Sequence, residues 1–158
     1  MRLPSKLIKV EFEVDPSEWH GYSSERIWAR KFLFRKEAVV ASAPFFIRGV
    51  SNGDIIYIMD EGGYRFSSVV SKSGHATVRI RTLKEGKSSG AVRTWLDRLI
   101  NTGCSCELAQ FDEMNLWSVD VPRLVSESEV ISILYGGADA DVWDAEVGDS
   151  AGRFDSLV

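Results

Sequence analysis

Alternation of hydrophobic and polar residues is the main pattern in the first half of the chain. Residues 7–14 read LIKVEFEV, which places Ile8, Val10, Phe12 and Val14 on one side of an extended segment. A period of two is typical of a half-buried β-strand. Similar short segments, separated by turn residues, predict strands at 25–34, 37–42, 54–60 and 64–71. Five such strands favour a small antiparallel β sheet or barrel over residues 1–74.

The second half of the chain mixes this period with a helical one. Alternating segments predict strands at 75–82, 104–110, 115–121 and 141–147. One helix is expected to end near Gly103, and a second follows the capping box of Ser126 and Glu129 and ends at Gly136-Gly137. The order βαββαβ is that of a ferredoxin-like unit, which we expect over residues 75–148, and residues 149–158 are expected to form a flexible tail. The predicted class is therefore α+β.

A polar face follows from this order. With strands arranged 4-1-3-2, the helix-free side of the sheet carries Arg79 and Arg81 together with Asp120, Asp144 and Glu146. Pairing of opposite charges across strands is one interpretation, because such pairs stabilise neighbouring strands modestly. The other is a polar binding face or cleft against the N-terminal sheet. Two interpretations are likewise open for the apolar loop at residues 44–46: a plug for the barrel or its neighbour, or the wall of a ligand site.

Charge is distributed unevenly along the chain. The net charge is −4, but residues 1–111 hold 17 Lys/Arg and 12 Asp/Glu (net +5), whereas residues 112–158 hold 2 and 11 (net −9). Such a run is either a solvated surface or an acidic face that meets a basic partner. The residues predicted for partner binding are Glu127, Glu129, Asp139, Asp141, Asp144 and Glu146.

Residues for catalysis or for metal binding are few. Cys104 and Cys106 are the only cysteines, and His20 and His75 are the only histidines, so a four-ligand zinc site would use all of them. No nucleophile elbow and no phosphate loop is present, and we expect no cofactor, no metal and no enzymatic activity. A possible ligand site between the two halves would use Glu25, Trp28, His75, Arg79 and Cys104.

Composition also bears on partners and location. The presumed open sheet face lacks an aromatic pair and the unit is acidic, so we expect no nucleic acid partner. No apolar run approaches the ~20 residues of a membrane span, and the first residues lack the apolar core of a secretory signal. Two cysteines in i, i+2 positions fit reduced thiols. We therefore expect a cytoplasmic protein, monomeric or weakly dimeric, without a membrane partner.

A family resemblance is carried by short motifs in a fixed order over residues 10–148. They are Glu25-Arg-Ile-Trp28-Ala29, Ala43-Pro44-Phe45-Phe46, Gly49, Gly53-Asp54, Ser73-Gly74-His75 with Thr77 and Arg79, Leu99 with Gly103-Cys104, Asp120-Val-Pro122 and Trp143. In this the chain resembles an uncharacterised bacterial family, one of the domains of unknown function. The resemblance implies a cytosolic bacterial protein and no established activity. Where family members often have an Asn before the Pro-Phe-Phe motif, this chain has Ser42-Ala43.

Two functional hypotheses follow. Some small acidic bacterial proteins of this kind resemble immunity proteins of toxin–immunity pairs, including those of contact-dependent inhibition. The leading hypothesis is therefore an immunity or antitoxin protein that neutralises a basic toxin, for example a nuclease, by stoichiometric protein–protein binding. The alternative is a small-molecule-binding domain or enzyme with its site between the two subdomains.

Overall fold

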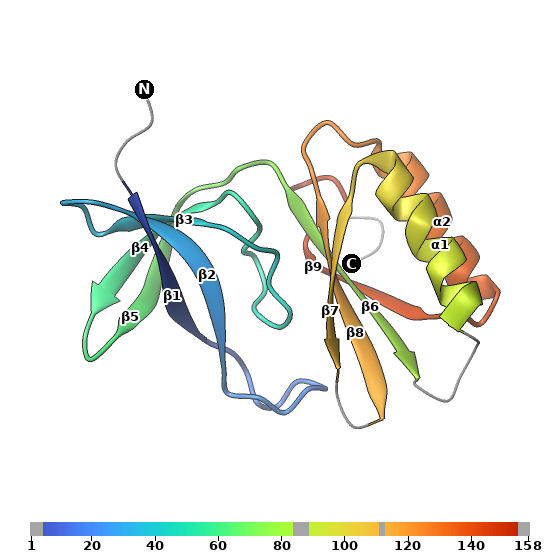
Figure 1. The fold of residues 1–158 in the computed structure, drawn as a ribbon, viewed down its shortest axis with the longest axis horizontal. Helices are drawn as coiled ribbons and strands as arrows, with labels where there is room; N and C mark the ends of the chain where they lie inside the picture. The colour runs from blue at the N-terminus through green and yellow to red at the C-terminus, as the bar shows by residue number, and fades with distance from the viewer. Residues whose placement is uncertain (1–4, 84–88, 111–112, 155–158) are drawn as a thin grey trace.

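The computed structural model describes residues 5–83, 89–110 and 113–154 and arranges them in two units side by side (Figure 1). The first is a closed barrel of five strands, and the second is a four-stranded sheet with two helices on one face. The barrel strands are β1 (Ser5–Glu13), β2 (Ser24–Phe32), β3 (Glu37–Val40), β4 (Ile55–Asp60) and β5 (Tyr64–Ser71). The second unit contains β6 (Ala76–Leu83), α1 (Ser89–Thr102), β7 (Ser105–Gln110), β8 (Met114–Val121), α2 (Glu127–Asp139) and β9 (Asp144–Asp149).

The barrel confirms the alternation of the first strand. Ile8, Val10 and Phe12 of β1 are buried in its interior together with Ile27 and Ile56 of other strands. Neighbouring strands are antiparallel except at the closure, where β1 and β5 pair in parallel over only two residue pairs. The purely antiparallel expectation is therefore wrong at this seam. An odd number of strands that alternate in direction necessarily brings the first and the last together in parallel.

The second sheet has the strand order β7-β8-β6-β9, with every neighbouring pair antiparallel. The first and third strands of the unit are therefore central, as the sequence predicts. Both helices lie on the same face, which Figure 1 shows on the side away from the barrel. Between helices and sheet lies an apolar core that includes Val78, Ile80, Leu99, Val119 and Leu134.

The second helix is longer than predicted. It continues through Gly136 and Gly137 to Asp139, so the end expected at the glycine pair is wrong. These glycines serve close packing instead. A Cβ at Gly136 would lie 2.6 Å from the ring of Trp95, and one at Gly137 would overlap the ring of Trp143. The two indole rings are themselves in contact, with centroids 6.2 Å apart.

The C-terminal strand and the residues after it also differ from expectation. The strand begins at Asp144 rather than 141, and Ala145 is exposed rather than inward, although Trp143 is buried as predicted. Residues 149–154 were expected to belong to a flexible tail. Instead Phe154 is fully buried in the helix-side core, and Arg153 donates hydrogen bonds to backbone carbonyls including that of Val121. Residues 155–158 lie outside the described part of the chain.

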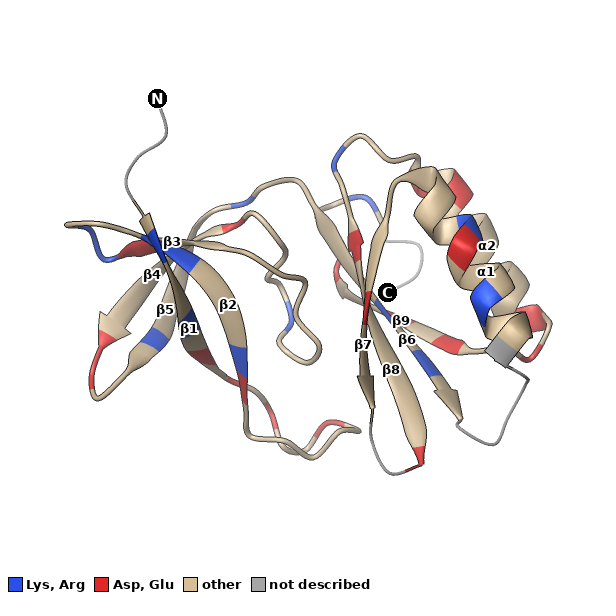
Figure 2. Ribbon diagram, viewed as in Figure 1, with Lys and Arg blue, Asp and Glu red and all other residues tan. Residues whose placement is uncertain are grey.

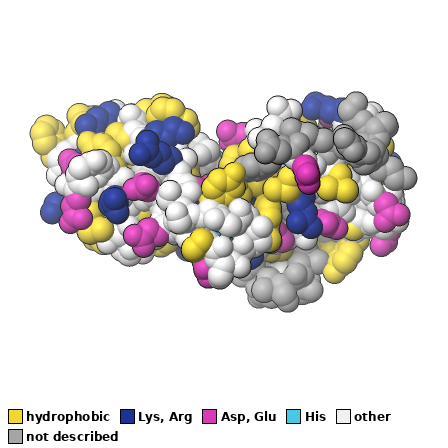
Figure 3. Space-filling model, turned by 90° about the horizontal axis from the view of Figure 1, so that it is seen from below, with side chains coloured by type: hydrophobic (Ala, Val, Ile, Leu, Met, Phe, Trp, Pro, Cys, Tyr) yellow, Lys and Arg dark blue, Asp and Glu magenta, His cyan; other side chains and the backbone are white. Residues whose placement is uncertain are grey.

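The barrel packs against the helix-free face of the second sheet through two of its loops, residues 14–23 and 41–54. A small apolar cluster of Val14, Phe46 and Leu116 lies between the units. Figure 3 shows hydrophobic side chains gathered near the middle of the face seen from below. Among the described residues, no helix is long and apolar enough to cross a membrane.

Candidate functional site

The loop of residues 41–54 is the main bridge from the barrel to the second sheet. Glu25, near the start of β2, fixes its shape, because its carboxylate accepts the backbone N–H groups of Phe45 (2.9 Å), Phe46 (2.8 Å) and Ile47 (2.7 Å). Hydrogen bonds to an ionised acceptor are about twice as strong as neutral ones. The carboxylate of Glu25 therefore positions the loop.

Arg79 lies in the middle of β6 and is only 1% exposed. Its Nη1 is 3.3 Å from Oε1 of Glu146, and its Nη2 donates to the carbonyl of Ile47. Within the described part of the chain, its Nε has no hydrogen-bond partner. Gly148 leaves room for this side chain, since a Cβ there would lie 2.8 Å from the guanidinium carbon. Burial lowers the pKa of Arg79, with Glu146 acting in the opposite direction.

A pocket of about 210 Å³ lies between the loop that joins β1 to β2 and the open face of the second sheet. Its charged walls are paired: Arg81 contacts Asp144 at 2.8 Å, and the guanidinium of Arg81 lies 5.6 Å from the ring centroid of Trp19. The indole Nε1 of Trp19 donates to Glu146 at 3.3 Å. The lining residues are Trp19, Arg79, Arg81, Leu116, Asp144, Ala145 and Glu146.

Arg48 connects the bridging loop to β9, where it contacts Glu146 of the pocket lining. Its guanidinium pairs with Glu18 (3.1 Å) and Glu146 (3.4 Å) and donates to the carbonyl of Val147. The hydrogen bond from Arg48 lowers the pKa of the Glu18 carboxyl. Three segments distant in sequence thus meet at one exposed arginine.

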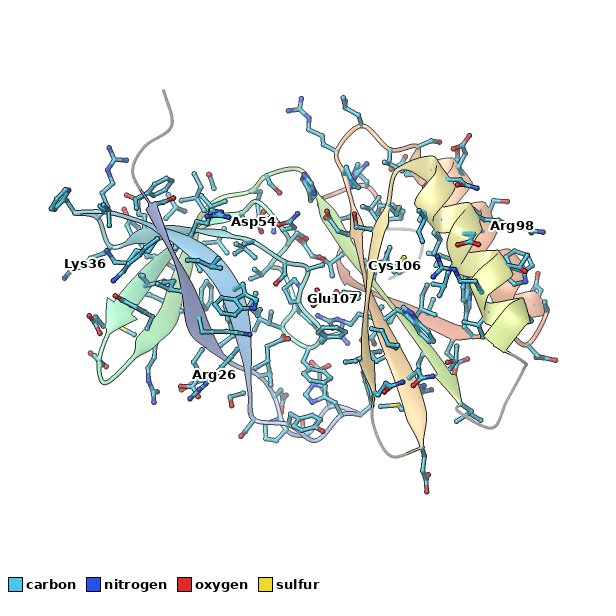
Figure 4. The ribbon with its side chains drawn as sticks, in the orientation of Figure 1. Arg26, Lys36, Asp54, Arg98, Cys106 and Glu107 are labelled. Carbon is cyan, nitrogen blue, oxygen red and sulfur yellow. The ribbon has the colours of Figure 1, made fainter. Side chains whose placement is uncertain are left out.

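A second polar cluster joins the units at the start of β6. Asp54 is fully buried and accepts the N–H of Ser51 at 2.9 Å. The ammonium group of Lys72 contacts the carboxylates of both Asp54 and Asp149, the latter at 2.5 Å. The hydroxyl of Ser51 lies 2.6 Å from Asp149 and 2.7 Å from the hydroxyl of Thr77. One ammonium thus bridges two carboxylates that also accept from Ser51, and this arrangement suits a structural joint. Figure 4 labels Asp54 there.

A third cluster contains the histidine that follows the Ser73-Gly74 turn. His75 Nδ1 lies 2.8 Å from Oδ1 of Asp120, and the amide of Asn52 donates to the other oxygen of that carboxylate at 3.1 Å. The hydroxyl of Ser73 donates to the carbonyl of Asn52 at 2.7 Å. An aspartate that orients a histidine through Nδ1 leaves Nε2 for proton transfer, as in general acid–base sites.

The five residues of the predicted ligand site lie in different surroundings. Trp28 is on the outside of the barrel under the ammonium of Lys9, 4.3 Å from the ring centroid. Cys104 is buried in the core between sheet and helices, where burial raises the pKa of its thiol. His75 and Arg79 share a sheet face but are four residues apart, about 13 Å along a strand. Arg79 alone of the five lines the pocket.

The acidic residues predicted for partner binding divide into two groups. Glu146 and Asp144 stand directly opposite Arg79 and Arg81 in the pairing of β6 with β9, so the predicted pairing of charges across strands is confirmed. The other four are exposed and lie around the two ends of α2, where Figure 2 shows acidic positions. They are Glu127, Glu129, Asp139 and Asp141.

Sequence reasoning did not assign a role to the loop of residues 17–24. In the structure, Trp19, His20 and Tyr22 surround Phe46, with ring centroids 6.1, 4.5 and 5.0 Å from its ring. Phe46 therefore acts as a plug between the units, while Trp19 forms a wall of the pocket. The sequence feature that could have indicated this contact is the presence of three aromatic residues in one otherwise polar loop.

Metal ligands do not converge in the described ranges. No group of three or more His, Cys, Asp or Glu side chains among residues 5–83, 89–110 and 113–154 is arranged to hold a metal ion. The sheet separates the two thiols from His75: Cys106 stands opposite Val119 and packs against the helix-side core, whereas Glu107 lies on the barrel side of β7 (Figure 4).

Comparison with known proteins identifies the family and the fold. The model of a domain of unknown function, DUF4265, matches residues 25–145. A solved structure described as a novel crystal structure of a hypothetical protein from Neisseria gonorrhoeae is similar, with a TM-score of 0.68 and 14% identity. The match covers 94% of this chain and 97% of that one, and at this identity it shows the fold alone. Among curated proteins, none matches the chain.

Proposed function

The chain belongs to the DUF4265 family, and we propose that it is a binding protein whose ligand occupies the pocket between the β1–β2 loop and the open face of the second sheet. The supporting observation is the combination of side chains in the lining: the aromatic ring of Trp19, the half-exposed Arg81 and the buried guanidinium of Arg79, whose Nε has no hydrogen-bond partner among the described residues. An unsatisfied buried donor costs roughly 1–3 kcal/mol, so a ligand acceptor at this position would recover stability.

The lining residues indicate the class of ligand. The pocket is smaller than the ~300–1,000 Å³ typical of drug-sized ligands, so it suits a small metabolite. A carboxylate or similar oxygen acceptor would meet Arg79 or Arg81, and the remainder of the molecule would pack on Trp19 and Leu116. The carboxylates of Asp144 and Glu146 favour a second, donor group on the same ligand. A small zwitterion, such as an α-amino acid, has this combination.

The test begins with native mass spectrometry of the purified protein, followed by titration calorimetry with a panel of amino acids, mono- and dicarboxylates and inorganic phosphate. We expect one zwitterionic class to bind. Trp19→Ala should abolish binding, whereas Trp28→Ala removes a comparably exposed tryptophan on the barrel exterior and should leave it unchanged. Failure of the whole panel to bind, or equal losses in both variants, would contradict the proposal.

Arg81 gives a second and gentler test of the same site. Its side chain is 43% exposed and its pair with Asp144 is at the surface, so Arg81→Gln should leave folding unchanged. We expect weaker binding of the carboxylate ligand by about tenfold, the loss of one charge-assisted hydrogen bond. Arg26→Gln on the barrel, labelled in Figure 4, is the matched control.

A second candidate function is the immunity-type binding of a basic protein partner. It is favoured by the net charge of −9 in residues 112–158 and by the exposure of the four carboxylates around α2. Co-purification with the product of the adjacent gene is the test, with protection from that product as the readout. Charge reversal at Glu127, Glu129, Asp139 and Asp141 should abolish association, whereas reversal at Asp60 and Glu61 of the barrel should not. No association at low salt would rule this function out.

We assign the second unit to the ferredoxin-like class and the protein to the bacterial cytoplasm as a monomer or weak dimer. The βαββαβ order and the arrangement β7-β8-β6-β9 support the first assignment. Two free cysteines support a reducing compartment. Analytical ultracentrifugation would test the oligomeric state.

A further inference from the structure

The turn between β2 and β3 displays Phe34 with its side chain fully exposed (101%). The residue also has φ +67°, a left-handed conformation that bulky side chains rarely adopt and that Asn or Gly would adopt at little cost. Neither feature benefits the folded chain, because the phenyl ring stays in water and the backbone is strained. A residue held this way is a candidate for contact with something outside the molecule.

Basic residues surround this ring. Leu33 beside it is 39% exposed, and Lys31, Arg35 and Lys36 flank the two apolar residues within one turn. Lys31 stands opposite Lys6 of β1, but its ammonium donates to the carbonyl of Phe32 and that of Lys6 lies over the ring of Tyr64. The exposed cations of the turn are therefore Arg35 and Lys36. The acidic residue next to the turn in sequence is Glu37.

The turn is the part of the barrel farthest from the pocket and from the second sheet. Figure 4 labels Lys36 at the outer end of the barrel, and Figure 3 shows hydrophobic and basic side chains intermingled at that end. The shape is a convex tip rather than a groove. A single protruding ring with cations beside it can insert into a deformable, negatively charged surface without a preformed cavity, whereas a protein partner would need a concave pocket for the ring.

We propose that residues 31–36 form a tip that binds an anionic phospholipid surface. The ring of Phe34 and the side chain of Leu33 enter the boundary between headgroups and acyl chains, while the exposed Arg35 and Lys36 contact phosphates. Aromatic and aliphatic side chains with basic neighbours are the usual elements of interfacial binding. The proposed attachment is peripheral and is an alternative to the prediction, drawn from the sequence, of no membrane partner.

Vesicle co-sedimentation tests this directly, using the full chain with vesicles of phosphatidylcholine alone or mixed with phosphatidylglycerol. We expect binding to the mixed vesicles, weakened by salt, and little binding to phosphatidylcholine alone. Phe34→Asn should reduce partitioning by about tenfold, as expected for the loss of one buried phenyl group. Because Asn adopts positive φ readily, this variant should fold at least as well as the parent chain.

Charge variants separate the two contributions. Arg35→Gln and Lys36→Gln should each reduce binding to the mixed vesicles roughly fivefold. Leu124→Asn is the matched control, because Leu124 is 94% exposed on the second unit and should not affect binding. No binding of the parent chain to mixed vesicles at low salt would overturn the proposal and leave a protein pocket as the contact of Phe34. Equal reductions by Leu124→Asn and Phe34→Asn would overturn it as well.

Discussion

The second sheet buries aliphatic side chains such as Val78, Ile80 and Val119 against its helices, while its other face buries Thr77, Arg79 and Ser118 against the barrel. The apolar face needs only shape and volume, because hydrophobic burial has no direction. The polar face needs a specific partner for nearly every group, since an unpaired buried donor or acceptor is costly. The helix layer therefore contributes most of the stability, whereas the barrel-facing layer determines how the two units are placed and where the pocket lies.

The largest effect is expected on the apolar face, at Phe154. Truncation by Phe154→Ala removes a fully buried ring from the core formed with Leu99 and Trp143, at a cost of about 3–5 kcal/mol of unfolding free energy. Urea denaturation measures the loss. Leu124→Ala, at a 94% exposed position, should change stability by less than about 0.5 kcal/mol. Equal stability of Phe154→Ala and the parent chain would mean that residues 149–154 do not belong to the core.

A somewhat smaller effect is expected at Arg79 on the polar face, and its size depends on whether Glu146 is replaced as well. Arg79→Ala removes one partner of a largely buried ion pair and should cost about 3 kcal/mol. Arg79→Met combined with Glu146→Gln fills the same volume without charge and should recover most of that stability. The double variant should nevertheless lose ligand binding at the pocket. Thermal unfolding and calorimetry, performed on the same samples, distinguish the structural from the binding contribution.

A third test concerns Ser118, whose hydroxyl lies 2.9 Å from the carbonyl of Ala43 and 2.8 Å from that of Pro44. Ser118→Ala should cost about 1 kcal/mol, the usual contribution of one hydrogen bond. The matched change Thr94→Ala removes an exposed hydroxyl from α1 and should cost less. A Ser118→Ala variant as stable as the parent chain would show that the hydroxyl of Ser118 does not help to hold the bridging loop on the sheet.

The difference between the two faces also decides what could be predicted from the sequence. Periodicity locates the strands and both helices, because burial on one side leaves a repeating pattern in Val78 and Ile80. It also places Arg79 and Glu146 on the same helix-free face, since alternation along each strand and the strand order decide which face a residue occupies. The structure adds the register that sets the two directly opposite each other. A cleft between the open face and the N-terminal sheet, with Arg79 in it, was one of the predicted alternatives. The contribution of Trp19 was not predictable, because it reaches the pocket from a loop without any periodic pattern. The end of the second helix was predicted wrongly for a related reason. In the sequence, a glycine needed for contact with Trp143, such as Gly137, cannot be told from a glycine that ends a helix.

The smallest expected effect concerns the two thiols, which both lie on the apolar side of the sheet. Burial raises the pKa of Cys106 from its ordinary value of 9.0 to about 12, with neighbouring Cys104 as a smaller cause. A thiol that ionises later in the folded chain than in the unfolded one stabilises the fold fully below pH 9, and this contribution falls as the pH rises toward 12. The melting temperature of the parent chain should therefore decline more steeply above pH 9 than that of Cys106→Ala.

Alkylation of Cys106 at pH 8 should be much slower in the folded protein than in urea, since the thiolate is the reactive form. Fast alkylation of the folded chain at Cys106 would show that this side of β7 opens to solvent. The helix-side face of the sheet would then not be the more protected of the two faces at this position.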